Sequence, residues 1–97
     1  MPDSPFDLVL YVAPQSPASV RARRNLEALL DEYDEDRIRL AVRDVASDPE
    51  LAESDRVVFT PTLILRRDGA VARVVGDLVD PTAITNVLTM GGLEKKE

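Results

Sequence analysis

The sequence predicts an α/β fold in which a mixed four-stranded sheet carries helices on both faces. Three observations predict this class. Two strand-like segments are each followed by a Ser-Pro or Asp-Pro pair, which is typical of a helix that begins there. Pro61 stands at the start of a later apolar strand, a place where its missing N–H is tolerated. Asp68-Gly69 then predicts a tight hairpin turn, so the expected order is β-α-β-α-β-β-α.

The first strand and the first helix are predicted over residues 6–33. Residues 8–12 are apolar without interruption, which suits a central strand covered on both faces, here Phe6 to Val12. Ser16 is the expected N-cap, and Pro17 is the first residue of a helix that continues to about Tyr33. The apolar stripe of this helix consists of Ala18, Ala22, Leu26, Leu29, Leu30 and Tyr33.

The second unit begins with a strand over residues 37–45 in which apolar and charged side chains alternate. One face carries Ile38, Leu40 and Val42, and the other carries Arg37, Arg39 and Arg43. This pattern predicts a half-buried strand at an edge of the sheet, where charges also deter unwanted pairing. Asp48-Pro49 predicts a short helix that runs to about Asp55, with Leu51 facing inward.

The remaining chain predicts a hairpin and a final helix. A strand over residues 62–67 turns at Asp68-Gly69, which pairs Arg67 with Ala70, Leu65 with Ala72 and Leu63 with Val74. The strand-centre members of this face are all apolar, and this supports the register. The last helix begins at Asp80-Pro81, carries Ile84, Val87 and Leu88, and ends at Gly91-Gly92. Residues 1–97 are expected to form one domain, with loose ends at 1–5 and 93–97.

The composition excludes several classes of function. The 97 residues include no cysteine and no histidine, which excludes thiol redox chemistry and removes the usual catalytic base and zinc ligand. We therefore expect no catalytic residue, no cofactor and no metal. The net charge of −6 disfavours nucleic acid as a partner. No run approaches the ~18 apolar residues of a membrane span, and no signal peptide is evident, so a cytoplasmic protein is expected.

Four colinear segments carry a family resemblance. They are Leu10-Tyr11-Val12-Ala13, then Ser19-Val20-Arg21-Ala22, then a block from Asp44 to Leu63 that ends in Thr60-Pro61-Thr62-Leu63, and finally Val74-Val75-Gly76-Asp77-Leu78. Thr-Pro before the third strand, in this element order, is the thioredoxin-like pattern. Taken together, the four segments resemble the KaiB family of circadian-clock proteins.

The resemblance implies a regulatory binding protein rather than an enzyme, one that modulates a clock, a timer or a stress response. KaiB binds the hexameric ATPase KaiC, so a KaiC-like ATPase is the expected partner, with a KaiA-like protein or a sensor kinase as further candidates. The resemblance also implies fold switching, in which a thioredoxin-like monomer is the form that binds KaiC. In that form the Thr60–Pro61 bond is expected to be cis, and we expect a monomer or a weak homo-oligomer.

The chain departs from the cyanobacterial clock proteins at two places. Those proteins carry prolines between the third and fourth strands, where this chain has Arg67-Asp68-Gly69-Ala70. They also carry a glycine and an acidic residue at the positions of Val87 and Thr89, and glycine inside a helix costs roughly 1 kcal/mol relative to alanine. Both differences favour the thioredoxin-like arrangement, which we expect to be the resting form.

Arginines supply the candidate partner-binding residues. The resemblance implies Arg21 and Arg56, because the family's partner surface includes basic residues near these positions. Arg23 and Arg24 join them because they lie in the first two turns of the first helix, where cations oppose the helix dipole. Arg23 is expected to pair with Glu27, four residues later. The alternative is that these arginines form an ordinary solvated face.

Two other functions stay open. Ser16 lies where thioredoxins keep Cys-x-x-Cys, and although a hydroxyl cannot replace a thiol, Ser16 and the loop before Thr62 could bind glutathione in a thioredoxin-fold binder or transferase. The chain could also be a sensory input domain of a histidine kinase. The acidic run of residues 31–36 lacks the glycine and the final glutamate of a calcium loop, so we interpret it as a solvated turn.

Overall fold

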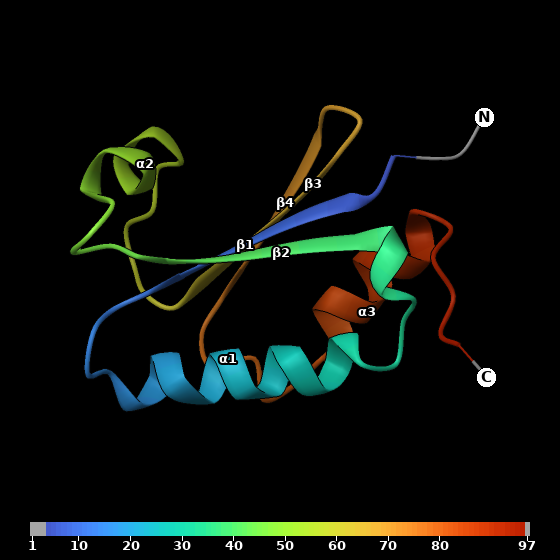
Figure 1. Ribbon diagram of the computed structural model, residues 1–97, viewed down its shortest axis with the longest axis horizontal. Helices are drawn as coiled ribbons and strands as arrows, with labels where there is room; N and C mark the ends of the chain where they lie inside the picture. Colours follow the sequence, from blue (N-terminus) through green and yellow to red (C-terminus); the bar gives the residue numbers. More distant parts are fainter. Residues whose placement is uncertain (1–3, 97) are drawn as a thin grey trace.

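The computed structural model of the protein describes residues 4–96. Its elements are β1 (Phe6–Val12), α1 (Pro17–Leu30), a 3-10 turn η1 (Glu35–Arg37), β2 (Ile38–Asp44), α2 (Pro49–Ser54), β3 (Thr62–Arg67), β4 (Ala70–Val75) and α3 (Thr82–Met90), as Figure 1 shows. The predicted order β-α-β-α-β-β-α is confirmed.

The four strands form one mixed sheet in the order β2-β1-β3-β4. β1 pairs in parallel with β2 and antiparallel with β3, and β3 pairs antiparallel with β4. The predicted hairpin register is confirmed, with Arg67 opposite Ala70, Leu65 opposite Ala72 and Leu63 opposite Val74. Asp68 and Gly69 both have positive φ angles, 50° and 86°, which are the angles that a two-residue hairpin turn requires. The edge position of β2 is also confirmed.

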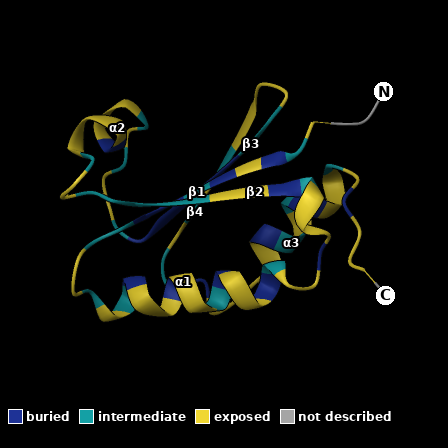
Figure 2. Ribbon diagram, viewed as in Figure 1, coloured by how far each residue is buried: buried dark blue, intermediate teal, exposed yellow. Residues whose placement is uncertain are grey.

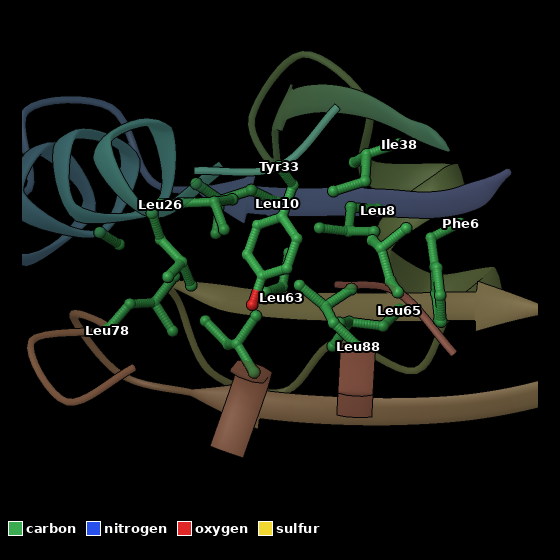
Figure 3. Packing of buried hydrophobic residues seen from close by; sticks show 14 residues of the cluster. Phe6, Leu8, Leu10, Leu26, Tyr33, Ile38, Leu63, Leu65, Leu78 and Leu88 are labelled. Carbon is green, nitrogen blue, oxygen red and sulfur yellow. The ribbon is translucent and has the colours of Figure 1, made fainter. Parts of the chain in front are cut away.

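α1 and α3 cover one face of the sheet. The main core lies between these two helices and the sheet. Phe6, Leu8 and Leu10 of β1 and Leu63 and Leu65 of β3 point to this side, as Figure 3 shows. From the helices come Ala22, Leu26, Leu29, Ile84 and Leu88, and Tyr33, Ile38, Leu78 and Leu93 complete the cluster. Because a strand alternates its side chains, the odd-numbered residues of β1 face the opposite side.

The opposite face is covered only in part, by the six-residue helix α2 at one end of the sheet (Figures 1 and 2). Ala52 of α2 packs there on Tyr11 and Ile64, with Val9, Val45 and Val57 around them. The prediction that Leu51 faces inward is wrong, since its side chain is 43% exposed and Ala52 is buried instead. Six residues make fewer than two helical turns, so few positions of α2 can face the sheet, and Ala52 is the one that is buried there.

Local signals set the helix ends. Ser16 caps α1, because its hydroxyl accepts from the Ser19 N–H at 3.2 Å, as predicted. The helix ends at Leu30, and residues 31–33 form a turn that still buries Tyr33. The Asp48 side chain makes no cap hydrogen bond to α2. The Asp80 carboxylate accepts from the Thr82 N–H at 3.0 Å. Because α3 begins at Thr82, Asp80 stands one residue before the N-cap position, which Pro81 occupies.

The expectation of a loose C-terminal end from residue 93 needs correction. The side chain of Leu93 is only 3% exposed and belongs to the main core. The backbone N–H of Lys96 donates to the carbonyl oxygen of Glu32 at 2.8 Å, which ties the tail to the end of α1. Residues 93–96 are therefore part of the packed structure. Residues 1–3 and 97, the outer parts of the expected loose ends, lie outside the described residues.

Candidate partner-binding surfaces

Four loops meet at one end of the sheet, which we call the loop end: residues 13–16, 45–48, 55–61 and 76–81. They meet because the parallel strands β1 and β2 both finish there, while β3 begins and β4 finishes there. The Thr60–Pro61 peptide bond is cis, as expected for this fold. The carbonyl oxygen of Pro61 accepts from the Gly76 N–H at 3.0 Å, so the loop before β3 lies beside the loop after β4.

The loop end exposes large apolar side chains. Val58, Phe59 and Val79 are 78%, 67% and 76% exposed. The Phe59 carbonyl oxygen accepts from the Thr62 hydroxyl at 2.6 Å, so the backbone of this segment is held while the Phe59 ring faces outward. Grouped exposed apolar side chains are typical of a protein interaction site. Phe59 carries no local signal for such a role in the sequence, where it simply precedes Thr60-Pro61 at the start of a strand.

The four predicted arginines do not form one patch. Arg21, Arg23 and Arg24 lie on α1, whereas Arg56 follows α2 on the opposite side of the sheet. Arg21 Nε lies 3.3 Å from Asp77 Oδ2, and Asn25 donates to the Asp77 carbonyl oxygen at 2.9 Å, so this side of α1 is fixed to the loop after β4. The predicted pair of Arg23 and Glu27 is confirmed at 3.5 Å. Arg24 is exposed.

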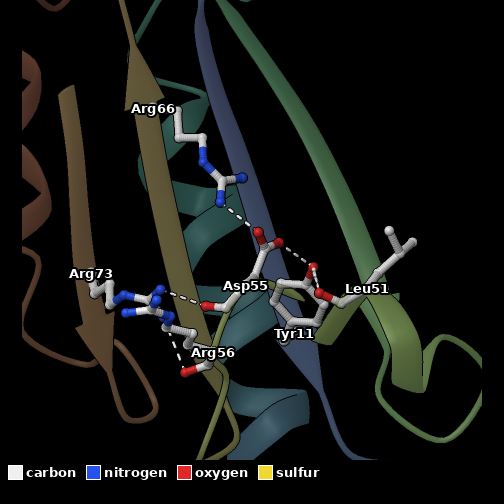
Figure 4. A network of polar contacts seen from close by, with 6 residues as sticks. All are labelled: Tyr11, Leu51, Asp55, Arg56, Arg66 and Arg73. Atoms are coloured by element: carbon white, nitrogen blue, oxygen red, sulfur yellow. Dashed lines mark hydrogen bonds and ion pairs between the residues drawn. The ribbon is translucent and has the colours of Figure 1, made fainter. Parts of the chain in front are cut away.

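A polar network attaches the end of α2 to the sheet, as Figure 4 shows. Asp55 accepts from the hydroxyl of Tyr11 and, at 2.5 Å, from Nη2 of Arg66. The Tyr11 hydroxyl also lies 3.2 Å from the Leu51 carbonyl oxygen. Arg73 donates to the backbone carbonyl oxygens of Asp55 and Arg56. Arg56 has a φ angle of 56°, and the network holds its backbone at the border between α2 and the sheet.

Burial and charge change the acidities in this network. Burial, the hydrogen bond to Asp55 and the negative charge of Asp55 raise the pKa of Tyr11 to about 12. Burial acts to raise the pKa of Asp55 as well, but the hydrogen bonds from Tyr11 and Arg66 outweigh it and lower that pKa. The phenol is thus neutral and the carboxylate charged at neutral pH. This pair is a structural anchor, because the phenol and the carboxylate are both engaged with other groups of the protein.

The partly covered face of the sheet carries further arginines. We call it the open face and define it by the strand positions Asp7, Val9, Tyr11, Arg39, Ala41, Arg43, Thr62, Ile64, Arg66, Val71, Arg73 and Val75. Four of these positions are arginine and one is aspartate. The alternation of arginines in β2 was a signal for this surface in the sequence, but it suggested only protection of an edge. Arg66 and Arg73 gave no signal until the strand order and register placed Arg66 beside Asp7 of β1 and Arg73 beside Ile64 of β3, on the same face as the arginines of β2.

The serines at the start of α1 are used by the backbone. Ser16 caps the helix, and the Ser19 hydroxyl accepts from the Ala13 N–H at 3.0 Å. Nothing in this geometry favours a small-molecule site there. Within residues 4–96 no three carboxylate, histidine or cysteine side chains come together as metal ligands. Over the same range, no helix has the length and apolar character needed to cross a bilayer.

Comparison with solved structures shows a thioredoxin-like fold. The oxidised form of mitochondrial thioredoxin 3 from Saccharomyces cerevisiae superposes with a TM-score of 0.74 at 22% identity, covering 89% of this chain and 78% of that chain. A malarial protein superposes with a TM-score of 0.78 at 21% identity, covering 89% of this chain and 97% of that chain. At these identities the likeness concerns the fold alone.

Comparison by sequence is more specific. The family model described as the KaiB domain matches residues 9–90. The circadian clock oscillator protein KaiB of Microcystis aeruginosa is 42% identical over 75 residues, which are 77% of this chain and 72% of that protein. KaiB of Synechococcus elongatus is 40% identical over 79 residues, which are 81% of this chain and 78% of that protein. The chain therefore belongs to the KaiB family.

Proposed function

We propose that this protein is a non-enzymatic regulator that docks, in its thioredoxin-like form, on a KaiC-type hexameric ATPase and so modulates a clock, a timer or a stress response. Three facts support the proposal: membership of the KaiB family, the naming of its relatives as circadian clock oscillator proteins, and the absence of cysteine from a thioredoxin-like chain. The observation that carries it furthest is the loop end, where exposed Val58 and Phe59 stand two and three residues after the basic Arg56.

Apolar side chains beside a charge suit a protein partner. Burial of an exposed aromatic ring in a partner's pocket is a typical anchor of an interface, and arginine is enriched at the same sites. We propose that Val58 and Phe59 supply such an anchor and that Arg56 contacts an acidic group near it. We propose Arg21, Arg23 and Arg24 as further contacts, from the N-terminal part of α1, which begins at the loop end. A KaiA-like protein or a sensor kinase would be alternative partners. We further propose that the protein is cytoplasmic and that it is a monomer or a weak homo-oligomer.

The test mixes the purified protein with the KaiC-type ATPase of its own genome, with and without ATP, and measures complex formation by size-exclusion chromatography with light scattering. We expect a complex. Phe59→Ser should weaken it by about tenfold or more, because a central aromatic anchor contributes 2 kcal/mol or more in typical interfaces. Met90→Ser is the matched control, since Met90 is also a large exposed apolar side chain, at 87%, but lies at the end of α3.

The charge contribution is tested in the same assay. Arg56→Glu should weaken the complex, whereas Lys95→Glu, an equal change of charge in the C-terminal tail, should leave it within about twofold. Absence of any complex, with and without ATP, would contradict the proposed function. Equal effects of Phe59→Ser and Met90→Ser would instead show that the partner binds elsewhere on the molecule.

A further inference from the structure

We propose that the open face is a docking site for an acidic amphipathic helix of a partner protein, which lies beside α2 and completes the second helical layer of the sheet. The proposal rests on the proposed function in that the partner is a protein. It adds the chemistry of the partner segment and the surface that receives it. This surface includes none of the four arginines predicted from the sequence.

The residues of the open face are brought together by the strand register. Across the sheet, Arg39 of β2 lies beside Asp7 of β1, which lies beside Arg66 of β3, which lies beside Val71 of β4. The next row on this face is Ala41, Val9, Ile64 and Arg73. The third row begins with Arg43 and Tyr11. α2 covers only Tyr11, Ile64 and part of Val9, so the first row and the β2 side stay uncovered.

The uncovered part has an apolar floor within a basic frame. Two adjoining depressions of about 300 and 330 Å³ share Asp7, Arg39 and Arg66 in their linings. The second depression is lined by Val9, Ala41 and Arg43. The first depression is lined by Val71, which is 55% exposed. Arg39 and Arg43 flank Ala41 on β2, and Arg66 and Arg73 stand on the far side of Val9, on β3 and β4, with Val71 beyond Arg66.

The charge of this face is opposite to that of the whole chain. The open face carries four arginines, which are met by Asp7 from β1 and Asp55 from the end of α2. Arg39 keeps a side chain that is 69% exposed even though its Nε lies 2.9 Å from Asp7 Oδ1. The chain as a whole has a net charge of −6. A local positive field of this kind selects an acidic partner and steers its approach.

The geometry favours a helix as the occupant. The face of a sheet presents side chains only, because the backbone N–H and C=O groups point to neighbouring strands, so an extended segment would gain no ladder there. Arg39 and Arg66 stand two strands apart, or about 10 Å, and Arg39 and Arg43 stand four residues apart, or about 13 Å. A single α-helix is about 10–12 Å wide. Its apolar stripe would cover Val9 and Ala41 while glutamates on both flanks reach the arginines.

The first experiment probes the surface without the ATPase. A helical peptide of about 18 residues, with a leucine stripe flanked by glutamates, is titrated into the ¹⁵N-labelled protein and followed by NMR. We expect shifts of the amides of Asp7, Val9, Arg39 and Ala41, and none along α1. A peptide with lysine in place of glutamate should not bind. Arg39→Glu/Arg43→Glu should weaken binding by about tenfold or more, whereas Lys95→Glu/Lys96→Glu should not.

A variant that binds the peptide more tightly than the wild type is informative, because a failure to fold could not produce that result. Asp7→Asn removes a negative charge from the open face, so it should tighten the binding of the acidic peptide by a few fold. Shifts confined to other surfaces would overturn the proposal, and so would equal binding of the lysine peptide. Binding of polyglutamate as tight as that of the amphipathic peptide would overturn the helix as occupant. A single-stranded oligonucleotide that displaces the peptide at lower concentration would overturn a protein partner.

The second experiment uses the KaiC-type ATPase itself. If the wild-type protein binds the ATPase and Arg39→Glu/Arg43→Glu binds it equally well, the open face is not the docking site and the proposal fails while the proposed function stands. If the wild-type protein does not bind the ATPase, the proposed function fails, and the peptide titration decides the open face by itself. Loss of about tenfold in affinity, with the tail control unchanged, supports both.

Discussion

Two tyrosine hydroxyls show how differently one polar atom can be accommodated inside this protein. Tyr11 and Tyr33 are both fully buried. The hydroxyl of Tyr11 donates to the charged carboxylate of Asp55 and lies near the Leu51 carbonyl oxygen. The hydroxyl of Tyr33 lies in the aliphatic core, and within residues 4–96 it has no hydrogen-bond partner. A buried polar group is stabilising only where it is paired.

This contrast predicts opposite results for the same substitution. Tyr33→Phe should leave the free energy of unfolding unchanged or raise it by up to ~1 kcal/mol, because it removes an unpaired hydroxyl. Tyr11→Phe should lower it by about 1–3 kcal/mol, since Asp55 then loses a buried donor. Urea denaturation followed by circular dichroism measures both. Equal losses in the two variants would show that the Tyr33 hydroxyl has a partner after all.

The pKa of Tyr11 predicts a loss of stability at alkaline pH. That pKa is raised to about 12, and an unfolded tyrosine titrates near ~10. Between these values the folded state holds the proton and the unfolded state does not, so the free energy of unfolding falls as the pH rises. We expect this fall between about pH 10 and 12 to be steeper for the wild type than for Tyr11→Phe. Parallel curves would contradict the assignment.

Asp55 predicts a loss at acid pH. Its pKa is lowered by Tyr11 and Arg66 against the effect of burial. Its contribution is therefore complete above the unfolded value of ~3.9 and is lost as the pH falls through the lower folded value. Asp55→Asn cannot titrate, so its free energy of unfolding should depend less on pH below about 4. If the free energy of unfolding of Asp55→Asn depends on acid pH as that of the wild type does, another carboxylate causes the loss of stability.

Among the elements, the β3–β4 hairpin and α3 are the two that we expect to favour the thioredoxin-like arrangement over an alternative fold. The turn at Asp68 and Gly69 has the positive φ angles that suit a right-handed twist of the strands. In α3, Val87 packs against the main core, beside the buried Ile84 and Leu88. The strand order after residue 50 is thioredoxin-like, as expected. That this form is also the most populated one stays a prediction.

Val87→Gly tests that prediction. The loss of helix propensity and of apolar contact should lower the free energy of unfolding by about 1–3 kcal/mol. If an alternative fold lies within a few kcal/mol, its population should rise by tenfold or more and give a second set of NMR peaks. Asn86→Gly, on the exposed side of the same helix, is the matched control. If the variant shows only one set of NMR peaks until it unfolds, the alternative fold is too high in free energy to be populated.

The whole molecule combines an acidic surface with a few basic regions. Its net charge is −6, yet four arginines share the open face and Arg56 lies at the border of that face. One layer of helices is complete and the other consists of α2 alone. This uneven cover leaves both the open face and the loop end available to a partner. Attraction between charges at such surfaces is screened by salt.

The affinity for a KaiC-type ATPase should therefore depend on ionic strength. We expect the complex to weaken by about tenfold or more between about 0.05 and 0.5 M salt, because the Debye length falls well below 10 Å. The effect should be smaller for Arg39→Glu/Arg43→Glu, which lacks the attracting charges. Fluorescence anisotropy at several salt concentrations measures both. An affinity that does not change with salt would mean that apolar contacts alone hold the complex.

The sequence by itself determined the order of the elements, the hairpin register, the cap at Ser16, the pair of Arg23 and Glu27, and the family. Except for the family, which was inferred from four segments spread along the chain, these features depend on residues close together in the sequence, where period, turn type and capping act directly. The cis bond before Pro61 could be expected from the position of that proline in the fold. The basic residues of α1 could be named, but not their distance from Arg56 or the attachment of Arg21 to Asp77.

The tertiary structure alone decided the surroundings of Tyr11 and the composition of the open face. Tyr11 and Asp55 are separated by 44 residues, and Asp55 and Arg66 by 11, so no local period connects them. Likewise, Arg39, Arg66 and Arg73 share a surface only because β1 and β3 stand between β2 and β4. The sequence-based predictions that Leu51 faces inward and that the chain is loose from residue 93 were wrong. Each depends on which faces the strands turn toward the helices, and that is set by packing across the whole sheet.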